Sequence, residues 1–279
     1  MKENDAFHAK NILRAIGAGP DSGFDLAEGA LAFAALDRPR VPLDHYTGHL
    51  GDLAVAAGAN RSATPLSAEA AAGQLREVVV KEFGYAGDRL TYDDLQNANL
   101  MRVIDRRRGL PVALGILYIH IGRALGWTLN GLAFPGHFLI QLDFAGDRVI
   151  LDPFNDGRTL GAGDLRQLIK TLAGTERELE TSDYAAVSDR EILLRLQNNI
   201  KFRHMQMRNG KAALITVENM LLIAPASPAL WWEAGMLNAE IGNLHAATDA
   251  LEEFMRLEES SENRHRAATL MQKLRSQLN

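Results

Sequence analysis

The chain has 279 residues, and 47% of them are hydrophobic, which is enough for one large domain or two modest ones. Lysine and arginine number 30 against 35 aspartate and glutamate, so the net charge of -5 argues against nucleic acid as a partner. There is no cysteine, which excludes disulfides, thiolate metal sites and every cysteine-nucleophile mechanism. A charged start and no apolar run of about 18 residues predict a cytoplasmic protein without a membrane segment.

The first part, residues 7–82, is alanine-rich, with apolar residues at the three- and four-residue spacing of helices. Asp37 ends a first helical run, and another begins near His45. Ser67 is the expected N-cap of a third helix that continues to Val80.

The second part, residues 83–165, combines a helix with strands. An almost uniformly apolar run predicts a buried helix over Leu114–Leu125, which Gly126 ends. Three short runs separated by turn residues predict antiparallel strands at Thr128–Phe134, Phe138–Phe144 and Arg148–Leu151. A helix packed on a small antiparallel sheet is an α+β unit.

The third part is helical and repeats at an offset of 34 residues. The positions Ala213, Val217 and Met220 recur as Ala247, Leu251 and Phe254. This pattern resembles a tetratricopeptide repeat, with one complete unit at about Pro228–Ser260, a degenerate unit before it and a capping helix over Glu262–Leu278. We therefore expect a predominantly helical α+β protein with a first domain at 1–185 and a second at 186–279.

The order of motifs in the second part is that of a thiol acyl-transfer core. Gly109-Leu110-Pro111 begins the helix, His137 opens a strand and Asp152 ends the next. This order resembles the transglutaminase superfamily, where a cysteine at the helix N-terminus is activated by the histidine, which the aspartate orients. The position nearest to that cysteine is Pro111, so the resemblance implies a core without its nucleophile.

A more specific resemblance covers nearly the whole chain. It is carried by the segments Asn99-Leu100-Met101-Arg102-Val103-Ile104, Arg106-Arg107-Arg108-Gly109-Leu110-Pro111, Leu117-Tyr118, Pro135-Gly136-His137-Phe138 and Leu151-Asp152-Pro153-Phe154-Asn155-Asp156-Gly157. These segments resemble the SirB1 family of bacterial proteins, which implies a transglutaminase-like core of the second type followed by tetratricopeptide-like helices. The Asp152–Asn155 signature is also similar to the core of some eukaryotic F-box proteins, where a binding role is implied.

The candidate catalytic residues are His137 and Asp152, read either as a remnant dyad or as a structural pair that orders the core. The candidate binding residues are Asn99, Arg106, Arg107, Arg108, Phe138, Asn155 and Trp231. The three arginines would suit an acidic ligand. The alternative for them is salt bridges to Asp105, Asp93 or Asp94.

Other patterns predict no cofactor and no metal site. His45 and His49 have the spacing of a helical metal pair, but no third ligand is evident, so we interpret them as a coincidence on a solvated helix. The segment 161–163, Gly-Ala-Gly, is interpreted as a loop without the strand-loop-helix context of a phosphate site. Of Trp231 and Trp232, adjacency indicates that only one is exposed.

Three functions remain open. The first is a non-catalytic module that binds a peptide or protein in the cleft around His137, Asp152 and Asn155. The second is a hydrolase in which His137, oriented by Asp152, activates water. The third is a regulatory scaffold in which the repeats carry the partner and the core is vestigial. The missing thiol favours the first.

Overall fold

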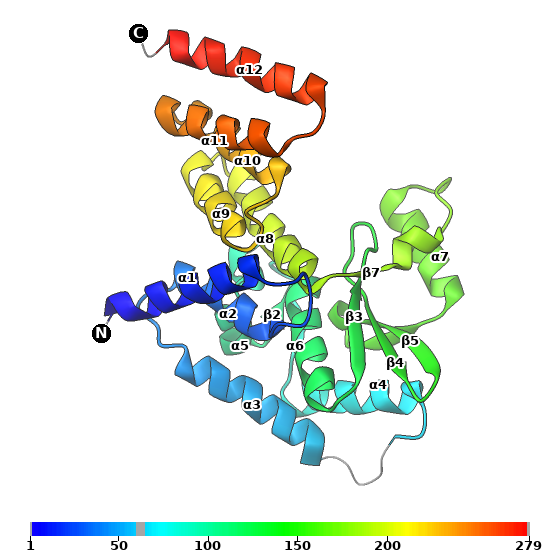
Figure 1. Cartoon of the computed structure of the whole chain (residues 1–279). Coiled ribbons are helices and arrows are strands. Elements are labelled where there is room, and N and C mark those ends of the chain that lie inside the picture. The colour runs from blue at the N-terminus through cyan, green and yellow to red at the C-terminus, as the bar shows by residue number, and fades with distance from the viewer. Residues whose placement is uncertain (1, 60–64, 278–279) are drawn as a thin grey trace. The chain divides into compact units, whose positions relative to one another are not determined.

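The structure is a computed structural model that describes residues 2–59 and 65–277 (Figure 1). The chain forms two compact units, the first from residues 1–12 and 21–196 and the second from 13–20 and 197–279. Helices α1 (Lys2–Ala18) and α8 (Asp189–Gln206) contribute residues to both. The expectation of a predominantly helical α+β fold is confirmed, whereas the domain boundary at residue 185 stays a prediction.

The first unit is mainly helical before its sheet begins. Its remaining α-helices are α2 (Leu26–Asp37), α3 (Asp44–Ala59), α4 (Ala68–Arg76), α5 (Leu100–Arg106), α6 (Pro111–Ala124) and α7 (Ala162–Ala173). Its shorter helical segments are the π-helix η1 (Glu77–Glu82) and the 3-10 turns η2 (Leu95–Ala98), η3 (Pro153–Asn155) and η4 (Thr181–Tyr184). Ser67 caps α4 as predicted, since its side chain accepts from Ala70 N at 3.2 Å. The helix expected to reach Val80 becomes π-helical at Glu77.

Five antiparallel strands form the sheet in the order β6-β5-β4-β3-β7. The strands are β3 (Thr128–Leu132), β4 (Ile140–Phe144), β5 (Asp147–Asp152), β6 (Arg158–Leu160) and β7 (Ala186–Val187). The three predicted strands are present, but β3 ends before Phe134 and β4 starts after Phe138, so His137 lies in the connection between them. A separate parallel pair joins β1 (Ala86–Gly87) to β2 (Arg108–Gly109).

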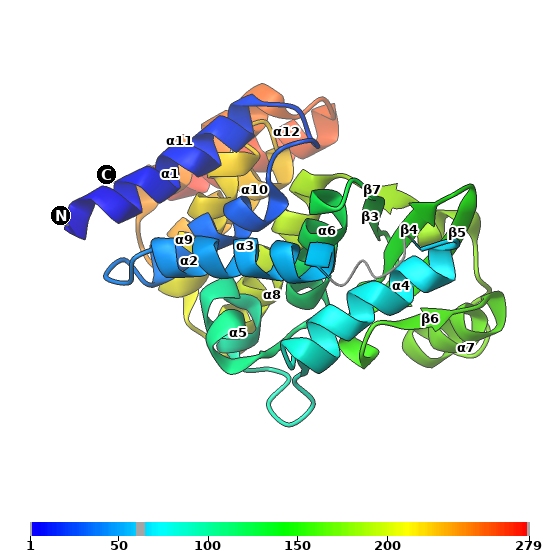
Figure 2. The ribbon, with the colours of Figure 1, turned by 90° about the horizontal axis from the view of Figure 1, so that it is seen from below.

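Helix α6 lies close against the sheet because it has glycines on the contacting side. A Cβ on Gly115 would lie 2.4 Å from the Phe138 ring, and one on Gly122 would lie 2.3 Å from Leu129. Pro111 supplies a favourable first position for this buried helix. Figure 2 shows α4 running alongside β4 and β5, which it contacts.

The other face of the sheet packs against α7. Their shared apolar cluster consists of Leu132, Phe134, Leu139, Leu160, Leu165 and Ile169. The interpretation of residues 161–163 as a loop is wrong, because α7 begins at Ala162, directly after β6. The Gly161 N–H donates to Asp164 at 2.9 Å, so the chain itself supplies an anionic partner at this helix end.

In the second unit, helices pair as the repeat pattern predicts. The helices are α9 (Gly210–Ile223), α10 (Pro228–Glu240), α11 (Leu244–Leu257) and α12 (Ser261–Ser276). The recurring positions of α9 and α11 are all buried. Leu278, the expected end of the last helix, lies outside the described residues.

Across residues 2–59 and 65–277, no helix combines the length and the apolar character needed to cross a membrane.

Candidate functional site

The two candidate catalytic residues meet in the structure. His137 Nε2 lies 2.8 Å from Asp152 Oδ1. The His137 side chain is 12% exposed and the Asp152 side chain 1%. The bond engages one ring nitrogen of His137, and no other group in the described parts of the chain hydrogen-bonds the second, Nδ1. The imidazole is thus held in one orientation by a buried carboxylate.

Asp152 also organises the turn that follows it. Its Oδ1 accepts from the backbone N–H groups of Phe154 and Asn155, and its Oδ2 accepts from the Asn155 amide at 2.6 Å. Burial alone would raise the pKa of Asp152, but the bonds from His137 and Asn155 outweigh it and lower the pKa below its ordinary value. The carboxylate therefore stays charged and acts as the centre of a local hydrogen-bond network.

Arg195, which the sequence did not single out, fixes the backbone that carries His137. One guanidinium nitrogen donates to the carbonyls of Phe134 and His137 at 3.0 and 2.7 Å. Its Cζ lies 5.6 Å from the centre of the Phe138 ring. Burial lowers the pKa of Arg195 from its ordinary value. Its distance of 58 residues from His137 along the chain explains why no local motif revealed it.

Asn155 links Asp152 to the surface. Its side-chain oxygen accepts from the exposed Arg89 at 2.5 Å. The neighbouring Phe154 ring stands edge-on to His137 and to Tyr92, with centroids 6.2 and 5.6 Å apart. Of the expected binding residues, Asn155 thus lies at the dyad, and Phe138 lies beside it but is buried against Gly115.

The start of α6 offers no nucleophile. Pro111, Val112 and Ala113 form its first turn, and all three are buried. None of these side chains has an atom that can attack a carbonyl. The tyrosine two turns further along, Tyr118, is fully buried, and burial raises its pKa from its ordinary value. The residues around His137 can therefore hold or move a proton but supply no thiolate.

The three consecutive arginines contact different groups of the protein, and a binding role for them stays a prediction. Arg106 donates to Asp88 at 2.7 Å and to Asn97 at 2.8 Å. The exposed Arg108 donates to the carbonyls of Gly84 and Arg107. The alternative of a salt bridge to Asp105, Asp93 or Asp94 is wrong for Arg106, which forms its ion pair with Asp88.

Asp88 and Asp105 show why that expectation fails. Burial alone would raise the pKa of Asp88, but bonds from Thr91 and Arg106 hold it well below its ordinary value. Asp105 instead pairs with Arg38 at 2.9 Å. The pair of Arg38 with Asp105 joins residues 67 positions apart and that of Arg106 with Asp88 joins residues 18 apart, so each holds two different elements of the first unit together.

Arg107 adopts a left-handed backbone conformation, with φ of 56°, and its side chain enters a buried cluster. It donates to Tyr85 Oη and to His49 Nε2, the latter at 2.7 Å. Burial and the Arg107 charge lower the pKa of His49 to about 4. His49 is therefore neutral and buried, so the interpretation of His45 and His49 as a pair on a solvated helix is wrong for His49.

No cluster of three metal-ligating side chains occurs among the residues that the structure describes.

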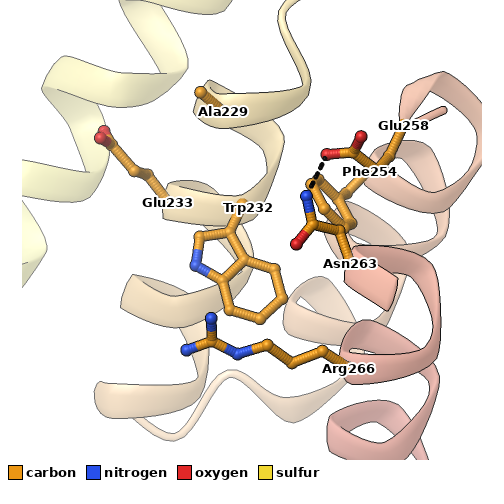
Figure 3. A pocket seen from close by; sticks show the side chains of 7 residues that line it. All are labelled: Ala229, Trp232, Glu233, Phe254, Glu258, Asn263 and Arg266. Carbon is orange, nitrogen blue, oxygen red and sulfur yellow. Dashed lines mark hydrogen bonds between the residues drawn. The ribbon is translucent and has the colours of Figure 1, made fainter. Parts of the chain in front are cut away.

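The two remaining expected binding residues are engaged by the protein itself. Asn99 caps α5 by accepting from Arg102 N, and its amide donates to the Ala34 carbonyl and to Asp37. Trp231 donates its indole N–H to the Pro225 carbonyl at 2.8 Å. The neighbouring Trp232 lines a cleft between α10 and α12 instead (Figure 3). Binding roles for Asn99 and Trp231 stay predictions.

Comparison with known families agrees with this geometry. Residues 44–198 match the transglutaminase-like superfamily, and residues 200–272 match the tetratricopeptide repeat. The resemblances drawn from the motifs and from the 34-residue offset are confirmed at this level.

Individual relatives are bacterial and eukaryotic. The chain is 32% identical over 208 residues to a UPF0162 protein of Pseudomonas aeruginosa, covering 73% of this chain and 74% of that protein. It is 30% identical over 190 residues to a UPF0162 protein of Xylella fastidiosa, covering 66% of each. F-box only protein 21 of Homo sapiens is 27% identical over 132 residues, 44% of this chain and 20% of that protein. The match thus spans slightly less than two thirds of the Xylella relative.

Proposed function

The chain belongs to the transglutaminase-like superfamily, and from that premise we propose that it is a non-catalytic member that binds a peptide or protein. Within the superfamily we assign it to the SirB1 type, on the motifs around Asn99, His137 and Asp152. Its tetratricopeptide region supports protein binding, because such repeats present extended surfaces to partners. The lack of cysteine fits a reducing compartment, so we place the protein in the cytoplasm.

One observation carries the proposal. The helix that would present the nucleophile begins with Pro111, Val112 and Ala113, and the 279 residues contain no cysteine. The remaining dyad members serve a structural network, in which Asp152 accepts from His137 and from the turn at Asn155. A core that keeps its scaffold without its nucleophile supports recognition better than acyl transfer.

The hydrolase alternative is favoured by one feature of the same pair. Asp152 holds His137 through Nε2, the arrangement that leaves the other ring nitrogen for general-base activation of water. The scaffold alternative, with a vestigial core and the partner on the repeats, predicts that partner binding follows the second unit alone.

Two assays on the full chain separate these functions. A phage-displayed library of short peptides is panned against the wild type, and hydrolysis of p-nitrophenyl acetate is measured for the wild type, His137→Gln and His45→Gln. His45 is an exposed histidine of the same unit and serves as the matched control. We expect enriched peptides and equal hydrolysis by all three proteins. A rate lost in His137→Gln but kept in His45→Gln would establish the hydrolase, and failure to enrich any peptide would refute peptide binding.

A further inference from the structure

A cavity of about 670 Å³ lies in the first unit, at the edge of the sheet where β6 ends and α7 begins. Figure 2 shows α4 and α7 on either side of β6, which contacts both. Neither His137 nor Asp152 lines this cavity, so it is separate from the dyad. The volume falls within the range of ligand pockets, about 300–1,000 Å³, and accommodates a whole small molecule.

A buried amide contributes an acceptor to the cavity wall. Gln141 of β4 lines the cavity although the residue is only 7% exposed. Its amide nitrogen donates to Asp143 Oδ2 at 2.7 Å, which fixes the orientation of the amide, because the opposite one would place oxygen against oxygen. Among the described residues, no group donates to the side-chain oxygen, Oε1. An acceptor buried in this way needs an N–H or O–H donor from a molecule in the cavity.

The same carboxylate holds an arginine of β5 at the cavity. Arg148 lies directly opposite Asp143 in the sheet and donates from Nε to Asp143 Oδ1 at 2.7 Å. This pair neutralises the charge of Arg148. In residues 2–59 and 65–277, no group accepts from its two terminal nitrogens. These nitrogens can therefore donate to a carbonyl oxygen of a ligand without adding net charge to the cavity.

Two charged side chains of the cavity have no opposite charge paired with them in the part of the chain that the structure describes. Glu69 of α4 accepts from the Thr159 hydroxyl at 3.1 Å and forms no ion pair there. Arg166 of α7 forms neither a hydrogen bond nor an ion pair there. The hydrogen bond from Lys170 and the charges of Lys170 and Arg166 lower the pKa of Glu178, but its ion pair is with Lys170, at 2.8 Å. The cavity thus offers one anionic contact from α4 and one cationic contact from α7.

The rest of the wall is largely aliphatic. Ile150 of β5 and Leu160 of β6 lie directly opposite each other in the sheet, and Leu165 and Leu179 extend this surface. Leu160 and Leu165 belong to the apolar cluster that packs α7 on the sheet, so they are firmly placed. Ile150 and Leu179 are only partly buried, which leaves apolar area for a ligand to cover.

We propose that this cavity binds a peptide of two or three apolar residues with free termini. The ammonium group of the peptide lies at Glu69 and its carboxylate at Arg166. A peptide N–H donates to Gln141 Oε1, and the aliphatic side chains lie against Ile150 and Leu165. Such a ligand is neutral overall, which matches one unpaired anion and one unpaired cation in the wall. The inference rests on the proposed peptide-binding function and gives that function a site and a ligand class.

Isothermal titration calorimetry on the full chain tests the proposal. The probes are Ala-Leu and Ala-Leu-Ala, each compared with its N-acetylated form and with its C-terminal amide. The variants are Glu69→Gln and Arg166→Gln. Glu28→Gln is the control for the first, because Glu28 is likewise an exposed acid in the first turn of a helix but does not line the cavity. Arg158→Gln, at an exposed position of β6 outside the cavity, is the control for the second.

We expect the wild type to bind the free peptides, and acetylation and amidation each to weaken binding about fivefold. Glu69→Gln should weaken binding of the free peptides about fivefold and remove the effect of acetylation while keeping that of amidation. Arg166→Gln should show the reverse. Both control variants should change affinity by less than about twofold. Gln141→Leu should weaken binding of every probe about fivefold, and circular dichroism checks that each variant keeps its fold.

Two results would overturn the assignment of this cavity. One is binding of the free peptides that neither Glu69→Gln nor Arg166→Gln weakens, and the other is an effect of acetylation and amidation that persists unchanged in both variants. If peptides from the library panning bind but the free peptides do not, the inference fails and the proposed function stands. If no peptide of either kind binds, both fail.

Discussion

Replacement of Tyr118 by phenylalanine is expected to stabilise the first unit. Tyr118 is 0% exposed, and its hydroxyl has no hydrogen-bond partner in residues 2–59 and 65–277. It lies against Gly157, where an added Cβ would be 2.3 Å from the hydroxyl oxygen. A buried hydroxyl without a partner costs about 1–3 kcal/mol in desolvation.

The expected gain is set by the hydroxyl that is removed, and a second buried tyrosine, Tyr85, serves as the control. Tyr118→Phe removes the desolvation cost and leaves a space of one oxygen atom, so we expect the free energy of unfolding to rise by about 1 kcal/mol. Tyr85 is 1% exposed, but its hydroxyl contacts His49 and accepts from Arg107. Tyr85→Phe should therefore lower the free energy of unfolding by about 1–3 kcal/mol.

The assay is urea unfolding by far-UV circular dichroism, combined with hydrogen exchange of the amides of α6. Exchange reports on the first unit alone, which matters because two units need not unfold together. A loss of stability of more than about 1 kcal/mol in Tyr118→Phe would refute the reasoning, because it would mean that the hydroxyl makes a stabilising bond.

Three further predictions concern other buried groups. His49 has a pKa of about 4 in the folded chain against an ordinary 6.5, so the unfolded chain binds the proton first as the pH falls. The free energy of unfolding should therefore decrease between pH 6.5 and pH 4 by on the order of 3 kcal/mol. In His49→Gln, the Tm from thermal melts should depend less on pH over that range. Gly115→Ala should lower Tm, because the added Cβ would overlap the Phe138 ring at a cost of about 1–3 kcal/mol. The control is Gly48→Ala, at an exposed helix position with open space around it, which should not lower Tm. Asp152→Asn replaces a carboxylate that accepts four hydrogen bonds with a neutral amide. Urea titrations should show a free energy of unfolding that is lower by about 3 kcal/mol. An unchanged unfolding midpoint would contradict the role of this network.

Local sequence patterns predicted most of the elements around the candidate site. The buried helix, the three strands and the cap at Ser67 all follow from periodicity and turn residues that lie close together in the chain. The wrong predictions concern segments whose composition is compatible with more than one local structure. The segment 161–163 has the composition of a loop, yet α7 begins at Ala162, and the helix is held on the sheet by Leu165 and Ile169, which lie further along the chain.

The candidate site was predictable only in part. His137 and Asp152 were found because their order and sequence context match a known core, and the structure brings them to 2.8 Å. Arg195 and Trp232 were not assigned a role, because each acts on residues that are distant in the chain or on another helix. No short motif marks such a partner.

The sequence by itself determined that this chain has no thiol chemistry, that its core has the transglutaminase-like order of motifs, and that its last part repeats at 34 residues. These properties depend on composition and on spacing along the chain. Only the tertiary structure decided which charges are already paired. Arg106 meets Asp88 and Arg107 meets His49, whereas Arg266 lies over Trp232 without an acceptor among the described residues. The physical reason is that ion pairs and aromatic contacts require atoms within a few ångströms, and packing sets those distances independently of separation along the chain.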